Sequence, residues 1–196
     1  MMMSEKILID NMSNDNKDKL SNGIIRKAAQ SDLPKLLDVD GECDSIVIMR
    51  LKIGKDKLKE ALHKRLNESN KEFYVYEIKK NVNNEYNKSE KNNCNKEIAG
   101  YATLKLEFPG YKNCELSWIA VKQKYHNKGI GKKLAKFIEK LAKKKGFRNI
   151  YAYTSEKGND KVHQFYKKLK YRKINALEDY YSDGTRAVLY GKSLNE

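Results

Sequence analysis

The chain has 196 residues, 39% of them hydrophobic, and a formal net charge of +15 at pH 7. This length suits one domain with a real core, and the charge suits an anionic ligand or partner without deciding the fold. Three cysteines without C-x-x-C spacing and three histidines without ligand spacing give neither a disulfide framework nor a metal site.

Two segments are rich in Asn and Lys and lack hydrophobic periodicity. Residues 1–22 are predicted to be a disordered tail and residues at about 80–96 an inserted low-complexity loop, because neither buries enough apolar surface to offset its ordering entropy. Residues 23–196 are expected to form the folded domain. The chain contains no signal-peptide core and no apolar stretch of about 18 residues, which predicts a soluble protein of the cytoplasm or nucleus.

The elements before residue 110 are predicted from periodicity and caps. Ser31 and Asp32 are typical helix N-caps, and Pro34 favours the first turn of the helix that follows. Leucines spaced four residues apart near 55–66 predict a second amphipathic helix. Alternating apolar residues predict strands at 23–28, 72–79 and 97–108, with a turn at Pro109-Gly110.

The second half of the chain alternates strands with helices. A strand at 114–122 leads into a glycine stretch, and apolar residues from Ile130 onward recur at the spacing of one helix face, up to a C-terminal Gly146. A strand at 149–154 and a helix at 160–169, capped by Asn159 or Asp160, come next. Residues 171–174 and 187–194 are predicted to close the fold as an antiparallel pair, so the fold class is α/β.

The glycine stretch "YHNKGIGKKL", residues 125–134, predicts a phosphate site at a helix start. Glycines allow the main chain to approach a ligand closely, and the first N–H groups of a helix are unpaired donors. A P-loop needs a Gly and a hydroxyl residue where His126 and Lys133 stand, and a dinucleotide fingerprint needs a Gly where Leu134 stands. Neither familiar phosphate loop therefore fits.

Three segments together carry a resemblance to a known family. The segment "HNKGIG", His126 to Gly131, resembles the acetyl-CoA signature of the GCN5-related N-acetyltransferase (GNAT) family, with His126 in place of Arg or Gln. The segment "NDKVHQFYKKLKY" is similar to the second cofactor motif of that family, with Lys170 in place of a glycine. The tail "DYYSDGTRAVLYGKSL" is like its last two strands, so the resemblance covers about residues 23–194.

The resemblance implies both a fold and an activity. The fold would be a twisted, mostly antiparallel sheet that splays at its middle and is flanked by helices. The activity would be direct transfer of acetyl from acetyl-CoA to a primary amine, with Glu115 as general base and Tyr166 as proton donor to the departing thiolate. The implied cofactor contacts are Ile119, Ala120, Val121, His126, Asn127, Lys128, Gly129, Ile130, Gly131, Lys132, Asn159 and Tyr166.

The acceptor is not identified by the resemblance. Tyr180 and Tyr181 stand where related protein N-terminal acetyltransferases place acceptor-contacting tyrosines. Residues 38–49 are the predicted acceptor loop, in which Asp40, Glu42 and Asp44 would attract a cationic amine. The acceptor remains a protein N-terminus, a lysine, a polyamine or a small amine, and the protein is expected to be a monomer or homodimer.

Two alternatives stay open. Because His126 and Lys170 depart from the family pattern, the chain could be a catalytically weak protein that binds CoA to regulate another process. Because of its charge, it could instead be a basic nucleic-acid-binding module. No helix-turn-helix, RNA-recognition or zinc-finger signature supports the second alternative, so no specific nucleic acid, membrane partner or metal is expected.

Overall fold

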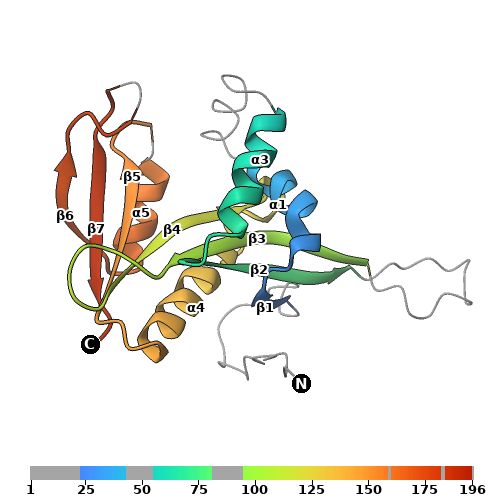
Figure 1. The fold of residues 1–196 in the computed structure, drawn as a ribbon, viewed down its shortest axis with the longest axis horizontal. Helices are drawn as coiled ribbons and strands as arrows, with labels where there is room; N and C mark the ends of the chain where they lie inside the picture. Colours follow the sequence, from blue (N-terminus) through green and yellow to red (C-terminus); the bar gives the residue numbers. More distant parts are fainter. Residues whose placement is uncertain (1–22, 43–54, 81–94, 159, 182–183, 196) are drawn as a thin grey trace, which may run out of the picture. The chain divides into compact units, whose positions relative to one another are not determined.

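The computed structural model describes residues 23–42, 55–80, 95–158, 160–181 and 184–195. Its seven strands form one sheet in the order β1-β2-β3-β4-β5-β7-β6 (Figure 1). The strands are β1 (Gly23–Lys27), β2 (Lys71–Lys80), β3 (Asn95–Lys105), β4 (Asn113–Val121), β5 (Asn149–Ser155), β6 (Arg172–Leu177) and β7 (Ala187–Ser193). The described helices are α1 (Leu33–Asp40), α3 (Lys55–Leu66), α4 (Ile130–Lys144) and α5 (Asp160–Lys168), with short 3-10 helices η1 (Gln30–Asp32) and η2 (Gln123–Tyr125).

The expected mixed, mostly antiparallel sheet is confirmed. Strands β4 and β5 pair in parallel, whereas β1 with β2, β5 with β7, and β6 with β7 pair antiparallel. The chain divides into two compact units, and β2, β3, β4 and α4 each contribute residues to both. Of the described residues, the first unit holds 23–42, 55–66, 73–80, 95–101 and 120–134, and the second holds the rest.

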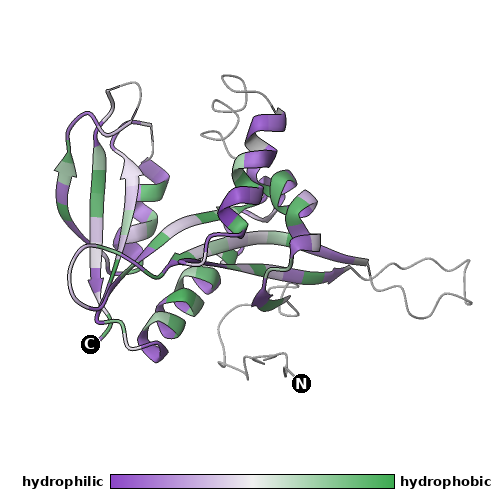
Figure 2. Cartoon of the chain, in the orientation of Figure 1, coloured by the Kyte–Doolittle hydropathy of each residue, from purple (hydrophilic) through white to green (hydrophobic). Residues whose placement is uncertain are grey.

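Helix α4 follows the amphipathic pattern that the sequence predicts. Hydrophobic and hydrophilic residues alternate along it in Figure 2, and the buried set recurs at three- and four-residue spacing. Gly146 ends the helix with a φ of +84°, a conformation that glycine adopts without strain. The buried residues of α4 are Ile130, Leu134, Ala135, Phe137, Ile138 and Ala142.

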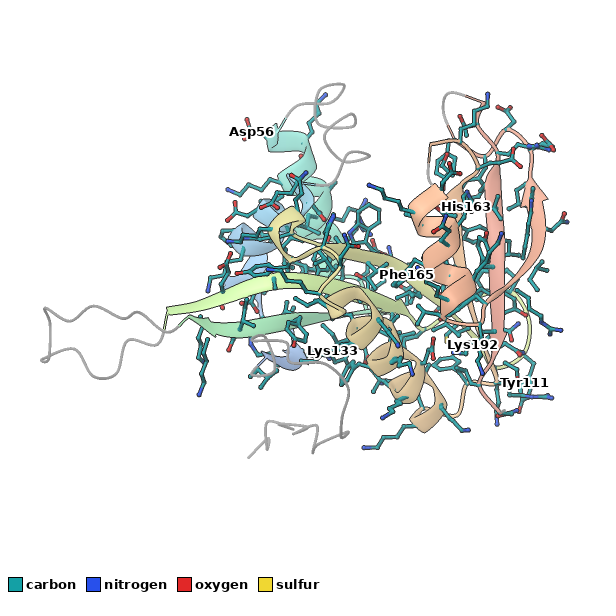
Figure 3. The ribbon with its side chains drawn as sticks, turned by 180° about the vertical axis from the view of Figure 1, so that it is seen from behind. Asp56, Tyr111, Lys133, His163, Phe165 and Lys192 are labelled. Carbon is teal, nitrogen blue, oxygen red and sulfur yellow. The ribbon has the colours of Figure 1, made fainter. Side chains whose placement is uncertain are left out.

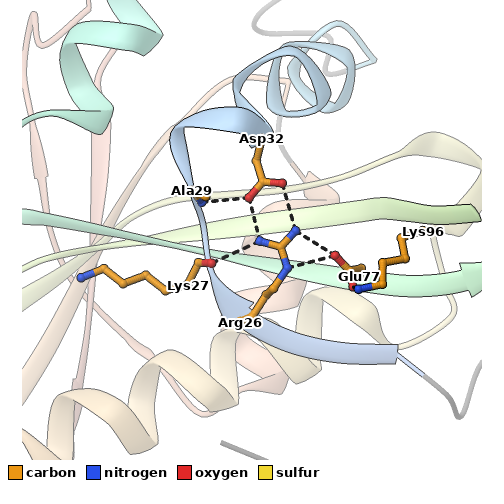
Figure 4. Close-up of polar contacts among 6 residues, drawn as sticks. All are labelled: Arg26, Lys27, Ala29, Asp32, Glu77 and Lys96. Carbon is orange, nitrogen blue, oxygen red and sulfur yellow. Dashed lines mark hydrogen bonds and ion pairs between the residues drawn. The ribbon is translucent and has the colours of Figure 1, made fainter. Parts of the chain in front are cut away.

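In the first unit, a buried ion cluster joins β1, β2 and η1 (Figure 4). Arg26 donates to both carboxylate oxygens of Asp32, at 2.7 and 2.9 Å, and to Glu77 at 2.8 and 2.9 Å. Burial is the largest single influence and would raise the pKa of each carboxyl, but the hydrogen bonds and charges of neighbouring groups, led by Arg26, together outweigh it and lower both pKa values. Asp32 precedes α1 as predicted, although its side chain binds Arg26 and the Ala29 N–H instead of capping the helix.

In the second unit, β5 separates from β4 partway along. The two strands pair only from Asn113 to Glu115, although both continue beyond this point within the described residues. Strand β5 instead pairs with β7 along its whole length, so the splay at the middle of the sheet is confirmed. The opening begins immediately after Glu115, which places that carboxylate at its start.

Several predicted boundaries shift when compared with the structure. Lys80, Asn95 and Lys96 belong to strands β2 and β3, so they are not part of the Asn/Lys-rich loop. The remainder of that loop, 81–94, and the predicted tail, 1–22, lie outside the described residues. Strand β7 lies between β5 and β6, an order that the sequence did not predict.

Candidate functional site

In the first unit, the turn between β4 and α4 exposes consecutive backbone N–H groups. Asn127 and Gly129 adopt positive φ angles, +59° and +76°, and α4 begins at Ile130. Lys133 donates its N–H to the Gly129 carbonyl, so the N–H groups of Gly129 and of the three residues after it have no partner within the helix. A Cβ at Gly129 would meet nothing within 4 Å. This turn can therefore cradle an anion such as a phosphate.

The charge around this turn is positive. The first turn of α4 carries no acidic residue, and Lys128 and Lys132 are exposed. The ammonium of Lys128 lies 5.4 Å from the centre of the Tyr125 ring, which keeps it beside the turn. Lys133 (Figure 3) instead places its ammonium 3.4 Å from the Tyr76 hydroxyl. The Lys133 ammonium is thus held by Tyr76 of β2, away from the turn.

His126, which replaces the family's usual Arg or Gln, folds back on the strand. Its Nε2 lies 2.7 Å from the Val121 carbonyl oxygen, and because a carbonyl only accepts, Nε2 carries the hydrogen and donates it. The ring thereby ties the turn to the end of β4. Sequence reasoning assigned His126 to the phosphate and did not predict this contact.

Gly100 is a further residue that sequence reasoning missed. It lies on β3, where a Cβ would come within 2.6 Å of the Ala120 carbonyl oxygen and 3.1 Å of the Val121 Cα. Only glycine allows β3 to approach this part of β4, which includes two of the predicted cofactor contacts. A single glycine inside a strand pattern was the available signal.

In the second unit, Glu115 stands at the point where β4 and β5 separate. Its side chain is 14% exposed, and the ammonium of Lys105 lies 3.7 Å from one carboxylate oxygen. The pKa values of Tyr153 and Tyr166 are both raised, first by burial and further by the negative charge of Glu115. The negative charge of Glu115 therefore helps to raise the pKa of one tyrosine on β5 and one on α5.

Tyr166 is a buried phenol on α5. Its residue is 4% exposed, and its ring stacks on Tyr190 of β7 with centroids 5.2 Å apart and meets Tyr171 edge-on at 5.4 Å. His163, one turn earlier on α5 (Figure 3), places Nδ1 2.9 Å from the Tyr190 hydroxyl. Burial raises the pKa of Tyr166, so its hydroxyl keeps its proton and remains a hydrogen-bond donor.

The predicted acceptor residues lie in both units. Tyr180, which is 49% exposed, stacks on Tyr153 with centroids 5.3 Å apart, and Tyr181 meets Tyr180 edge-on. In the first unit, Asp40 is buried and accepts a hydrogen bond from Tyr101 at 2.7 Å, which leaves it unsuited to attract a substrate amine. Glu42 accepts from the Gln123 N–H at 2.6 Å, whereas Asp44 and the cofactor candidate Asn159 lie outside the described residues.

Other chemical groups have structural roles. Cys114 is fully buried, burial raises the pKa of its thiol to about 12, and Sγ lies 3.5 Å from the Asn149 carbonyl, so it is no activated nucleophile. Among the described residues, no group of three or more His, Cys, Asp and Glu side chains is arranged to hold a metal ion. None of the helices that the structure describes is long and apolar enough to span a membrane.

Solved N-acetyltransferases share this fold. The ribosomal-protein-S18-alanine N-acetyltransferase from Escherichia coli is 14% identical, with a TM-score of 0.64 over 88% of this chain and 94% of that one. The PaiA N-acetyltransferase from Thermoplasma acidophilum, in complex with coenzyme A, is 22% identical, with a TM-score of 0.59 over 88% of this chain and 99% of that one. The spermidine/spermine N-acetyltransferase SpeG from Vibrio cholerae is 14% identical, with a TM-score of 0.61 over 89% of this chain and 94% of that one.

The architecture is thus that of the N-acetyltransferases, and the sequence identifies the family. Residues 54–171 match the acetyltransferase (GNAT) family, and the chain belongs to it. Members of this family are acetyl-CoA-dependent acyltransferases. No curated protein matches the sequence.

Proposed function

We propose that this protein transfers acetyl from acetyl-CoA directly to a primary amine. The observation that carries the proposal is that a half-buried carboxylate, Glu115, lies where β4 and β5 separate and that its charge acts on a buried and protonated phenol, Tyr166. A protein that only binds CoA needs neither group. This pair therefore favours catalysis over the regulatory alternative.

The turn between β4 and α4 fits the pyrophosphate of acetyl-CoA. The N–H groups from Asn127 to Lys132 would hold its pyrophosphate, because the positive φ angles and the open space at Gly129 leave room for an anion. The amides of Ile119 and Val121, with Ala120 between them, would hold the pantetheine arm and polarise the thioester carbonyl, as the family resemblance implies. When bound, acetyl-CoA supplies the acetyl group as a thioester.

Glu115 would take the proton of the acceptor amine. A lysine-like amine has a pKa of about 10.4 and is almost wholly protonated at neutral pH, so the base must remove a proton before the nitrogen can attack. The ammonium of Lys105 at 3.7 Å shows that this carboxylate accommodates a cationic nitrogen. The same carboxylate can bind the incoming ammonium and then accept its proton.

Tyr166 would stabilise the departing sulfur. Because its pKa is raised above that of an ordinary phenol, complete transfer of its proton to a thiolate with a pKa of roughly 8.5–9 is uphill. It would also leave a phenolate near the negative charge of Glu115. We therefore assign Tyr166 the donation of a hydrogen bond to the developing thiolate, a narrower role than full proton transfer.

The remaining predicted residues would contact the two substrates. Tyr180 and Tyr181 would contact the acceptor, in keeping with the solvent exposure of Tyr180. Asn159 would contact the cofactor at the start of α5. Nothing in the described structure favours a nucleic-acid-binding module over these assignments.

The experiment that tests the function is an acceptor panel. The purified chain is incubated with acetyl-CoA and N-terminal peptides, lysine peptides, spermidine and an aminoglycoside, and free thiol is measured together with the mass of each acceptor. Thiol release that depends on an amine, with a gain of one acetyl group on that amine, is expected. Saturable acetyl-CoA binding without transfer to any amine would instead support the regulatory alternative.

A further inference from the structure

Five aromatic side chains form a continuous row in the second unit. Phe108 stacks on Tyr151 with centroids 4.4 Å apart and lies 5.9 Å from Tyr153, which stacks on Tyr180 at 5.3 Å. Tyr181 meets Tyr180 at 5.1 Å. These rings, named here the aromatic row, come from the segment after β3, from β5 and from the segment after β6. Residues far apart in sequence thus build one surface.

The aromatic row lies on the face of β5 that is opposite to α5. Tyr190 of β7 is in register with Ala152, and its ring stacks on Tyr166 of α5, so α5 packs on the face that Ala152 shares. Because side chains alternate along a strand, Tyr151 and Tyr153 lie on the other face. Both are half-buried, whereas Ala152 is fully buried. The row is therefore accessible to a ligand.

Glu115 stands at the edge of this row. It is the register partner of Tyr151 across the parallel β4–β5 pair, so the two side chains leave the sheet on the same face. Tyr151 belongs to the row, so the carboxylate lies beside it. The proposed base and the aromatic row thus form one surface.

A pocket of about 440 Å³ continues the surface at the Phe108 end. Lys105 and Lys112 line it together with Phe108 and Phe147, and Glu107, which also lines it, accepts a hydrogen bond from the Asn70 side chain. Lys105 therefore contributes both to the pocket and to the contact with Glu115 at 3.7 Å. The carboxylate of Glu115 can bind an amine, and the neighbouring pocket, with two lysines and one glutamate, carries a net positive charge.

We propose that the acceptor is a peptidyl amine whose neighbouring residues are neutral or acidic, and that polycationic amines are poor substrates. The amine binds Glu115, the peptide lies along the aromatic row, and an acidic side chain enters the pocket of Lys105 and Lys112. This inference rests on the proposed function and narrows its substrate class.

Two features favour a peptide over a polyamine. Successive rings 4.4 to 5.9 Å apart form a long open surface, which suits an extended chain rising about 3.3 Å per residue. A polyamine needs a carboxylate for each ammonium, yet the pocket beside Glu115 is lined by two lysines, Lys105 and Lys112, against a single carboxylate, that of Glu107. Further cations would therefore be repelled, and an acidic group would be attracted.

The test compares acceptors that differ in one residue. Peptides of about six residues, identical except for Glu, Ala or Lys directly after the residue that bears the amine, are assayed beside spermidine. We expect kcat/KM to fall in the order Glu, Ala, Lys. The difference between the Glu and Lys peptides should be about tenfold, because the charges are partly exposed and solvent screens their interaction. Spermidine is expected at or below the Lys peptide.

A charge-reversal variant isolates the pocket. Lys112→Glu should invert the order so that the Lys peptide becomes the better substrate, with acetyl-CoA affinity unchanged. Lys173→Glu is the matched control, because Lys173 is exposed on β6 and in register with Tyr190, on the face opposite to the row. It should leave the order unchanged.

The outcomes separate the inference from the function. If spermidine equals or exceeds the Glu peptide, or if Lys112→Glu leaves the order of the peptides unaltered, the acceptor class is wrong while amine acetylation stands. If acetyl-CoA binds but no amine is acetylated, the proposed function is wrong, and the acceptor class is wrong with it.

Discussion

The functional features proposed for the two units are built in different ways. In the first unit, the anion cradle is made of consecutive residues, and its donors are main-chain N–H groups arranged by Asn127 and Gly129. In the second unit, the proposed reactive groups are side chains from separate elements, such as Glu115 on β4 and Tyr166 on α5. The cradle should therefore respond to changes in backbone space, and the reactive groups to the loss of single side-chain atoms.

A second comparison concerns two glutamates, one buried and one half-buried. Glu77 in the first unit is held by Arg26 at 2.8 Å and by Lys96 at 3.3 Å, within the cluster of Figure 4. Glu115 in the second unit has the ammonium of Lys105 at 3.7 Å, a looser contact than either. Glu77 is thus held by two cations inside a structural cluster, whereas Glu115 lies where β4 and β5 separate. This difference in position supports the choice of Glu115 as the base.

The largest effect is expected from filling the cradle. Gly131→Glu places a side chain and a negative charge beside the N–H groups at the start of α4, so acetyl-CoA binding should fall below detection in calorimetry. Lys136→Glu, five residues later on the exposed face of the same helix, is the charge control and should bind nearly normally. Full thermal stabilisation of the Gly131 variant by acetyl-CoA would rule out the cradle.

The next effect concerns the base. Glu115→Gln should lower kcat by roughly 10²- to 10⁴-fold while acetyl-CoA affinity stays constant. Raising the pH should recover part of the loss, because a larger fraction of the acceptor then arrives deprotonated. Steady-state rates across pH, with melting temperatures to verify folding, provide the measurement. A wild-type kcat in this variant would show that another group or a water accepts the proton.

A smaller effect is expected at the phenol. Tyr166→Phe removes one hydrogen bond to the leaving sulfur, so kcat should fall about 10- to 100-fold at every pH, without the rescue expected for the base. Tyr171→Phe is the matched control, because Tyr171 is an equally buried phenol that touches Tyr166 edge-on. If the two variants have equal kcat values, the loss reflects packing and not catalysis.

Local signals account for what the sequence could predict. Strands and helices followed from periodicity, and the cradle from glycines within one short segment whose backbone conformation those residues determine. Even the departure at Lys170 was interpretable, since the residue keeps the positive φ, +65°, of the glycine it replaces. Each of these features depends on neighbours along the chain.

Contacts between distant residues account for what the sequence did not predict. From the sequence, Asp40 was predicted to attract a substrate amine. In the structure its carboxylate is buried and accepts a hydrogen bond from Tyr101, 61 residues away. The stack of Phe108 on Tyr151 depends on strand order and on the path of the segment after β3, neither of which has a local signal. Side-chain surfaces assembled across a sheet therefore need the structure.

The smallest effect is expected at His126, and it tests whether the cradle acts through its backbone. The ring donates from Nε2 to the Val121 carbonyl at 2.7 Å, so His126→Ala should remove one neutral hydrogen bond, worth about 1 kcal/mol, and weaken acetyl-CoA binding by no more than about fivefold. Acetyl-CoA affinities of the wild-type protein and of the alanine variant, measured by calorimetry, provide the comparison. A loss of affinity much larger than this in the alanine variant, with an unchanged melting temperature, would mean that the imidazole contacts the phosphate and that the cradle relies on a side chain after all.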